Sequence, residues 1–82
     1  MHMQTAPQLK QTVGINIAAV RSELRLSRRA FGDLVGVDQM LIYKWERGLN
    51  GPSRENLIAL AAATGRDPSW FYADHGPKAK AA

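Results

Sequence analysis

The sequence predicts an all-α domain of five helices, and three observations lead to that fold class. Apolar residues recur every three or four positions through most of the chain, which places them on one face of a helix. No segment alternates apolar and polar residues with a period of two, so no strand is predicted. Helix-capping residues and glycines separate short segments, none of which is long enough to be stable alone. We therefore expect the five helices to bury their apolar faces against one another.

The first helix is predicted from about residue 10 to residue 24. This prediction depends on four apolar residues at helical spacing, namely Val13, Ile17, Val20 and Leu24. Residues 1–8 and 76–82 lack such a pattern, so we expect a disordered N-terminal arm and a disordered C-terminal tail around a domain of residues 9–75.

The second and third helices are predicted to be short and to be joined by a sharp turn. Ser27 is a good cap for the second helix, which ends at Gly36, and its buried stripe is expected to contain Phe31, Leu34 and Val35. Gly32 is a small residue at the place where the two helices cross.

The third helix has two unlike faces between its cap, Asp38, and the glycine that stops it, Gly48. One face carries Leu41, Ile42 and Trp45, and the other carries Gln39, Met40, Tyr43 and Lys44. The first face should pack back against the second helix. The other face is then left as an exposed ridge whose width fits the major groove of duplex DNA.

Two further helices are predicted after the third. Ser53 is expected to cap a fourth helix that ends at Gly65. Asp67 followed by Pro68 marks the start of a short fifth helix, because proline at the first helical position loses no hydrogen bond. Three aromatic residues follow in a row, namely Trp70, Phe71 and Tyr72. At least one of them should close the core.

Composition and charge narrow the possible functions. The chain has 82 residues, enough for one domain, and its formal charge of +4 and sequence pI near 10.0 favour polyanionic partners. It contains no cysteine and only two histidines, which lie far apart, so we expect no metal site and no cofactor. The usual sets of catalytic residues are missing as well, so we do not expect an enzyme.

The sequence also bears on location. No apolar run approaches the roughly 20 residues needed to span a bilayer, and the N-terminus lacks the apolar stretch of a secretory signal. We therefore expect no membrane association and a cytoplasmic, nucleoid-associated protein.

Residues 26–48, with the sequence LSRRAFGDLVGVDQMLIYKWERG, resemble the helix-turn-helix of the phage repressor and Cro family, also called the xenobiotic-response-element family. The features that carry the resemblance are Leu26-Ser27, Gly32, Gly36-Val37, Ile42 and the run from Trp45 to Gly48, and the similarity extends over about residues 13–72. The resemblance implies a lambda-repressor-like DNA-binding domain in which helices two and three form the helix-turn-helix. It also implies a transcriptional regulator, a repressor, that binds double-stranded DNA as a homodimer.

The resemblance assigns roles to individual residues. Residues 39–44 would read base edges in the major groove, through Gln39, Met40, Tyr43 and Lys44. The side chains suit that role, because glutamine pairs with adenine, lysine donates to guanine and methionine lies against a thymine methyl group. Phosphate contacts would come from helix ends and the loop after helix three, through Arg28, Arg47, Asn50 and Arg54.

Arg21 and Glu46 match an ion pair that members of the family form between helices one and three. The chain departs from the family at two positions. Arg28 stands where glutamine is common, which should raise the salt sensitivity of binding. Arg25 stands where glycine often ends helix one, and because arginine is strained at positive φ, we expect that turn to differ.

A protein-binding role is the alternative function. The chain could be an adaptor, or an antitoxin with this fold, with a toxin or an antirepressor as its protein partner. Such an interface could use exposed apolar residues, for which the candidates are Leu49, Trp70, Phe71 and Tyr72.

Overall fold

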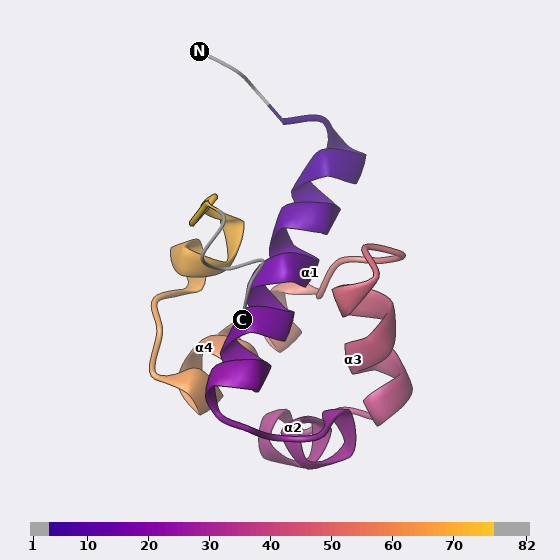
Figure 1. The fold of residues 1–82 in the computed structure, drawn as a ribbon, viewed down its shortest axis with the longest axis vertical. Coiled ribbons are helices and arrows are strands. Elements are labelled where there is room, and N and C mark those ends of the chain that lie inside the picture. The colour runs from indigo at the N-terminus through magenta and orange to yellow at the C-terminus, as the bar shows by residue number, and fades with distance from the viewer. Residues whose placement is uncertain (1–3, 77–82) are drawn as a thin grey trace.

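Residues 4–76 are described by a computed structural model, and they form four α-helices and one 3-10 helix (Figure 1). The elements are α1 (Ala6–Glu23), α2 (Arg28–Val35), α3 (Gln39–Glu46), α4 (Arg54–Thr64) and the 3-10 helix η1 (Pro68–Tyr72). Residues 4–76 contain no strand, so the predicted all-α class is confirmed. The predicted count of five α-helices is not confirmed, because the fifth segment, η1, is a five-residue 3-10 helix.

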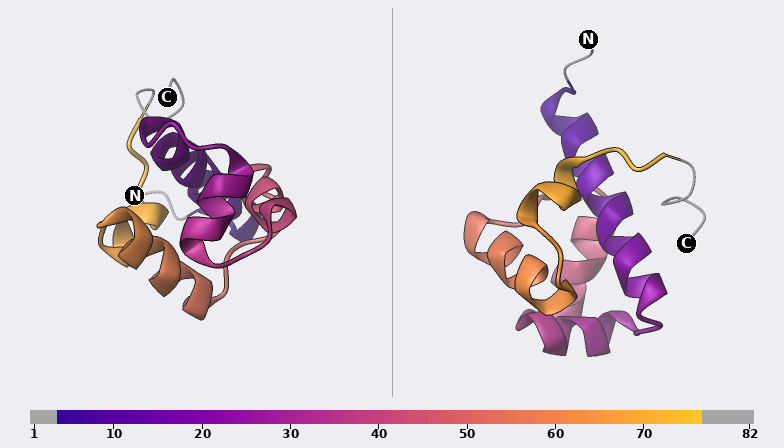
Figure 2. Two further views of the ribbon diagram at one scale, coloured as in Figure 1. Left: turned by 90° about the horizontal axis from the view of Figure 1, so that it is seen from below. Right: turned by 90° about the vertical axis from the view of Figure 1, so that its left-hand side faces the viewer.

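Helix α1 runs along most of the molecule, with α3 on one side of it and α4 and η1 on the other (Figure 1). Helix α2 crosses near one end of α1 and contacts both α3 and α4, an arrangement that is also visible from the two directions of Figure 2. Buried apolar residues from all five elements form one core: Val13, Ile17, Val20, Phe31, Val35, Ile42, Trp45, Leu57, Leu60, Ala61 and Phe71. Within residues 4–76, no helix has both the length and the apolar character needed to cross a membrane.

The predicted caps explain where three of the four α-helices begin. Ser27, Asp38 and Ser53 are the N-caps of α2, α3 and α4, and each side chain accepts a backbone N–H from the first turn of its helix. Asp67 has the same role at η1, where Pro68 follows it. These predictions from the sequence are confirmed.

Helix α1 begins at Ala6, about four residues earlier than predicted. Thr5 and Gln8 form a capping box, in which the Thr5 hydroxyl accepts the Gln8 N–H (3.3 Å) and Gln8 Oε1 accepts the Thr5 N–H (2.9 Å). Residues 6–8 of the predicted disordered arm are therefore helical. Residues 1–3 of that arm and residues 77–82 of the predicted tail lie outside the described part of the chain.

The turn after α1 also differs from the expectation. Arg25 does adopt a left-handed backbone conformation, with φ at 57°, despite the strain this causes in a residue with a Cβ. The conformation allows the Leu26 N–H to bond the Arg21 carbonyl oxygen at 3.2 Å, which satisfies one of the last carbonyls of α1. The turn thus keeps the geometry that glycine usually provides.

Two residues of the predicted apolar stripes are more exposed than expected. Leu24 lies just beyond the end of α1, and Leu34 faces solvent although it is adjacent to the buried Val35. In an eight-residue helix, Phe31, Gly32 and Val35 already fill the face that meets the core, and Leu34 lies at its margin.

A buried asparagine bonds the end of η1. Asn16 on α1 is 1% exposed, and its amide nitrogen donates to the carbonyl oxygens of Phe71 and Ala73, each at 2.8 Å. The Trp70 carbonyl oxygen is a weaker third acceptor at 3.4 Å. The backbone is extended at Ala73, so the segment ends there, and Asn16 satisfies the carbonyls that a longer helix would have used.

Candidate nucleic-acid interface

The turn between α2 and α3 is held by close backbone contact. Gly36 ends α2 with φ at 94°, and the N–H groups of Gly36 and Val37 both bond the Gly32 carbonyl oxygen, at 2.7 and 2.9 Å. A Cβ atom on Gly32 would lie only 2.6 Å from the Val37 carbonyl oxygen. The two glycines therefore allow the close crossing that fixes the angle of α3.

Helix α3 has the two faces that the sequence predicts. Ile42 and Trp45 are fully buried in the core, and Leu41 is half-buried beside them. The opposite face is exposed and carries all four predicted base-contacting residues, namely Gln39, Met40, Tyr43 and Lys44. The spacing of these residues along the helix brings them onto one side.

A shallow hollow lies beside this exposed face. It has a volume of about 240 Å³ and is lined by Arg28 from α2 and by Gln39, Met40 and Tyr43 from α3. Three of the four residues expected at base edges and one expected at phosphates thus line a single depression, and Lys44 lies outside it.

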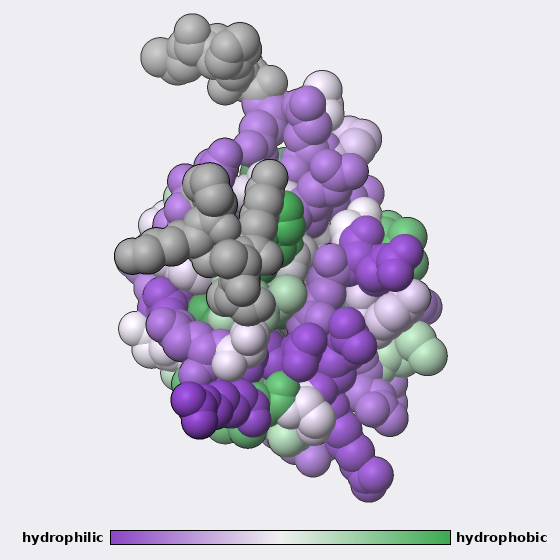
Figure 3. Space-filling view, viewed as in Figure 1, coloured by the Kyte–Doolittle hydropathy of each residue, from purple (hydrophilic) through white to green (hydrophobic). Residues whose placement is uncertain are grey.

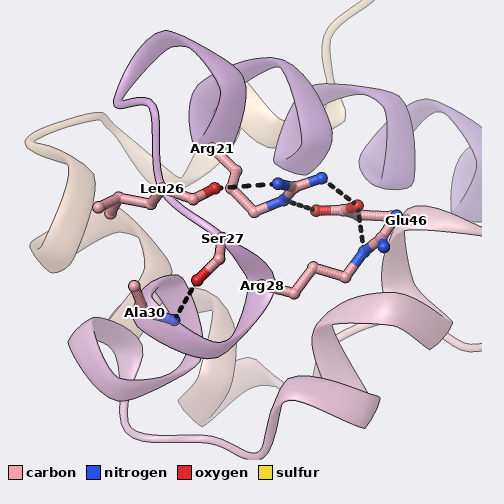
Figure 4. Close-up of polar contacts among 6 residues, drawn as sticks. All are labelled: Arg21, Leu26, Ser27, Arg28, Ala30 and Glu46. Carbon is pink, nitrogen blue, oxygen red and sulfur yellow. Dashed lines mark hydrogen bonds and ion pairs between the residues drawn. The ribbon is translucent and has the colours of Figure 1, made fainter.

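Glu46, at the end of α3, accepts hydrogen bonds from two arginines (Figure 4). Arg21 Nε lies 2.6 Å from Oε2 and Arg21 Nη2 lies 3.0 Å from Oε1, so the pair is bidentate. Arg21 Nη1 also donates to the Leu26 carbonyl oxygen at 3.0 Å. The hydrogen bond to Glu46 raises the pKa of Arg21, although partial burial acts in the opposite direction.

The second arginine on Glu46 is Arg28, an interaction that sequence reasoning missed. Arg28 Nε lies 2.9 Å from Glu46 Oε1, and only 4% of the Glu46 side chain is exposed, compared with 42% of the Arg28 side chain. The Arg28 guanidinium also lies over the Tyr43 ring, 5.3 Å from its centroid. No sequence signal reveals this contact, because it depends on the angle between α2 and α3.

The other predicted phosphate contacts follow one another along the chain. Arg47 comes directly after α3, Asn50 lies in the next loop, and Arg54 is the first residue of α4. All three are exposed, and their side chains form no hydrogen bond within residues 4–76. The start of α4 adds unpaired backbone N–H groups, which favour anions.

The surface is mostly hydrophilic in the view of Figure 3, with hydrophobic residues in small separate areas. Among the described residues, no cluster of histidine, cysteine, aspartate or glutamate could hold a metal ion. The exposed face of α3 offers hydrogen-bond donors, positive charge and a methionine side chain. This combination suits a nucleic acid, which is a polyanion with accessible base edges.

Comparison with known proteins identifies the family. The model of the helix-turn-helix family matches residues 17–71, which include all of α2, α3 and α4. The chain belongs to the helix-turn-helix family. This helix-turn-helix chain is 38% identical over 61 residues to Repressor protein C2 of Salmonella phage P22, a match that covers 74% of the chain and 28% of that protein.

A second relative is the HTH-type transcriptional regulator DicA of Escherichia coli (strain K12), with 28% identity over 60 residues. That match covers 73% of the helix-turn-helix chain and 44% of DicA, so the chain spans less than half the length of either curated relative. Among solved structures, the nuclear magnetic resonance structure of the DNA-binding domain of the P22 C2 repressor is similar, with a TM-score of 0.69 and 34% identity. The match covers 87% of this chain and 84% of the chain in that structure.

Proposed function

We propose that this helix-turn-helix protein binds specific sequences of double-stranded DNA and regulates transcription as a repressor. The observation that carries the proposal is the exposed face of α3, which presents Gln39, Met40 and Lys44 away from a packed core. Membership of the same family as the P22 C2 repressor supports it. A binding role of this kind requires no catalytic group, and it is consistent with the expected location beside the nucleoid.

The residues proposed to contact bases should each prefer a different base. Gln39, at the start of α3, would donate to and accept from adenine, and Lys44 would donate to guanine. Met40 is 56% exposed, and its side chain would lie against a thymine methyl group. Tyr43 shares this surface, but its ring contacts arginines.

Phosphate contacts would set the position of α3 in the groove. Arg28, Arg47, Asn50 and Arg54 are the proposed donors, and they come from the α2 start, the α3 end, the following loop and the α4 start. These contacts carry no sequence information directly, but they fix register and supply most of the salt dependence.

A protein-binding role is the second candidate, and one observation favours it. Leu49 is 63% exposed and Tyr72 is 42% exposed, which is high for side chains of their size. Phe71 is fully buried, and Trp70 is half-buried, so both belong mainly to the core. An antitoxin or adaptor interface would therefore use Leu49 and Tyr72, with a toxin or an antirepressor as the partner.

Selection of bound sequences from random duplexes tests the proposal. The selected duplex should bind more tightly than random DNA. Four cationic contacts to phosphates, from Arg28, Lys44, Arg47 and Arg54, predict a slope of log affinity on log salt of about −3.6. Lys44→Ala should weaken the selected duplex by about 1 to 3 kcal/mol and random DNA much less.

Arg54→Ala is the matched control, because Arg54 lies outside α3 but carries the same charge as Lys44. It should weaken all duplexes alike and reduce the salt slope by about one unit. Equal loss on selected and random DNA after Lys44→Ala would show that α3 does not read bases at this position. Failure to enrich any duplex, together with capture of a protein partner that Leu49→Ala abolishes, would favour the protein-binding role.

A further inference from the structure

Tyr43 contacts two arginines that come from different parts of the helix-turn-helix. Arg28 lies in the first turn of α2, and its guanidinium carbon is 5.3 Å from the centroid of the Tyr43 ring. Arg47 follows α3, and its guanidinium carbon is 5.8 Å from the same centroid. A guanidinium at this distance over an aromatic ring is attracted by the negative face of the π system. Arg28, Tyr43 and Arg47 are called here the arginine–tyrosine cluster.

A second contact fixes one of these arginines. The Arg28 Nε bonds Glu46 Oε1 at 2.9 Å, and the Glu46 carboxylate is nearly buried and is also bonded by Arg21. The carboxylate can neutralise only one positive charge, so the region around it stays positive. The two terminal nitrogens of Arg28 form no hydrogen bond within residues 4–76, which leaves them available as donors.

Tyr43 itself is poorly suited to the role of a base reader. Tyr43 is less exposed than its neighbour on this face, at 37% compared with 56% for Met40. Its hydroxyl group forms no hydrogen bond within the described residues, whereas its ring is in contact with both arginines. Within the fold, Tyr43 therefore interacts through its ring and not through its hydroxyl group.

We infer that Tyr43 is a positioning residue whose ring holds Arg28 and Arg47 as a prearranged pair of donors for DNA phosphates. The inference rests on the proposed DNA-binding function. Two arginines near one another repel and lose side-chain freedom when they bind. The ring offsets part of the repulsion and restricts both guanidinium groups before DNA arrives.

Replacing Tyr43 in two ways tests the inference by fluorescence anisotropy on the selected duplex and on a random one. Tyr43→Phe keeps the ring, so any loss of affinity should be equal on both duplexes and smaller than the loss for the leucine variant. Tyr43→Leu removes the ring, and both affinities should fall by the same factor. The expected loss is roughly 5- to 30-fold, which corresponds to two cation–π contacts at an exposed site. The salt slope should decrease as well, because the arginines no longer meet phosphates together.

Nuclear magnetic resonance of the protein without DNA gives an independent measurement. The ring current of Tyr43 should shift the side-chain resonances of Arg28 and Arg47 in the wild type and in Tyr43→Phe, and Tyr43→Leu should remove the shift. Thermal melting by circular dichroism checks that each variant is folded. If Tyr43→Leu does not fold, the wild-type spectrum decides the question, because side-chain resonances of Arg28 and Arg47 without a ring-current shift would contradict the inference.

Three results would overturn the inference. Tyr43→Phe could lose affinity for the selected duplex alone, which would assign base reading to the hydroxyl. Tyr43→Leu could fold and match the wild type on both duplexes, in which case the ring has no role while the proposed function stands. If the wild-type protein binds no duplex at all, that result would contradict both the proposed function and this inference.

Discussion

Glu46 shows how one residue can serve both the fold and the candidate interface. Its carboxylate lies almost out of contact with water and accepts hydrogen bonds from Arg21 on α1 and Arg28 on α2. Removal of one member of a buried charged pair is costly, because the remaining charge loses its partner without regaining full hydration. Glu46 therefore links the packing of α1 to the orientation of an arginine on the proposed DNA-binding surface.

Glu46→Ala should lower the free energy of unfolding by about 3 kcal/mol, because it leaves Arg21 and Arg28 without their carboxylate. Urea denaturation measures the loss. Arg28→Ala is the matched comparison, and it should cost less than about 1 kcal/mol, since Arg28 is well exposed and Glu46 keeps Arg21. In a double-mutant cycle, the loss for Arg21→Ala with Glu46→Ala should be smaller than the sum of the single losses. Purely additive losses would contradict a coupled pair.

Single residues differ in how well the sequence predicts their contacts. The exposure of the α3 face follows from helical spacing once Ile42 and Trp45 are assigned to the core. The second arginine on Glu46 does not follow, because charges on different helices meet only at a particular crossing angle. Asn16 was missed for another reason: it is a polar residue inside an apolar stripe, and its partners are backbone carbonyls more than 50 residues away.

At the scale of elements, the crossing of α2 and α3 depends on the absence of a side chain at Gly32. Gly32→Ala would place a Cβ 2.6 Å from the Val37 carbonyl oxygen, and backbone atoms would have to move. We expect a loss of about 1 to 3 kcal/mol in the free energy of unfolding, measured by urea denaturation. The α3 face should also tilt, so affinity for the selected duplex should fall.

Gly36→Asn is the control for this crossing, because a Cβ at Gly36 meets no atom within 4 Å and asparagine tolerates positive φ. Its effect on stability should be the smaller of the two. If Gly32→Ala proves as stable as the wild type and binds equally well, the close approach seen at this turn does not constrain α3.

The elements themselves were largely predictable where a cap and an apolar stripe occur together, as at Ser27, Asp38 and Ser53. The start of α1 was not, because its first turn extends beyond the core and carries only the capping box of Thr5 and Gln8. The spacing of apolar residues predicts the part of a helix that packs against the core, but it does not predict turns that project into solvent.

At the scale of the whole molecule, one eight-residue helix is available to read DNA. Such a helix contacts few base pairs, so we expect two copies to bind each site as a two-fold dimer, with half-sites about 34 Å apart. The contact between copies is expected near Leu49 or η1, where Leu49 and Tyr72 are exposed. Self-association without DNA can be weak.

Sedimentation of the protein with the selected duplex measures the stoichiometry. Two copies should bind the full site, whereas a duplex cut to one half-site should bind one copy with lower affinity. Leu49→Ala should reduce cooperative binding to the full site but leave half-site binding unchanged. A single copy on the full site would contradict the dimer.

The link between Asn16 and the end of η1 has a consequence for how the domain opens. It joins positions 54 to 57 residues apart, and η1 lies across α1 from α3 (Figure 1). Opening of η1 would break these bonds and expose Phe71, while the contacts between α2 and α3 remain. Local unfolding is therefore graded, and amide hydrogens of η1 are expected to exchange before those of α2 and α3. The exposed face of α3 can therefore keep its shape while η1, on the other side of α1, opens.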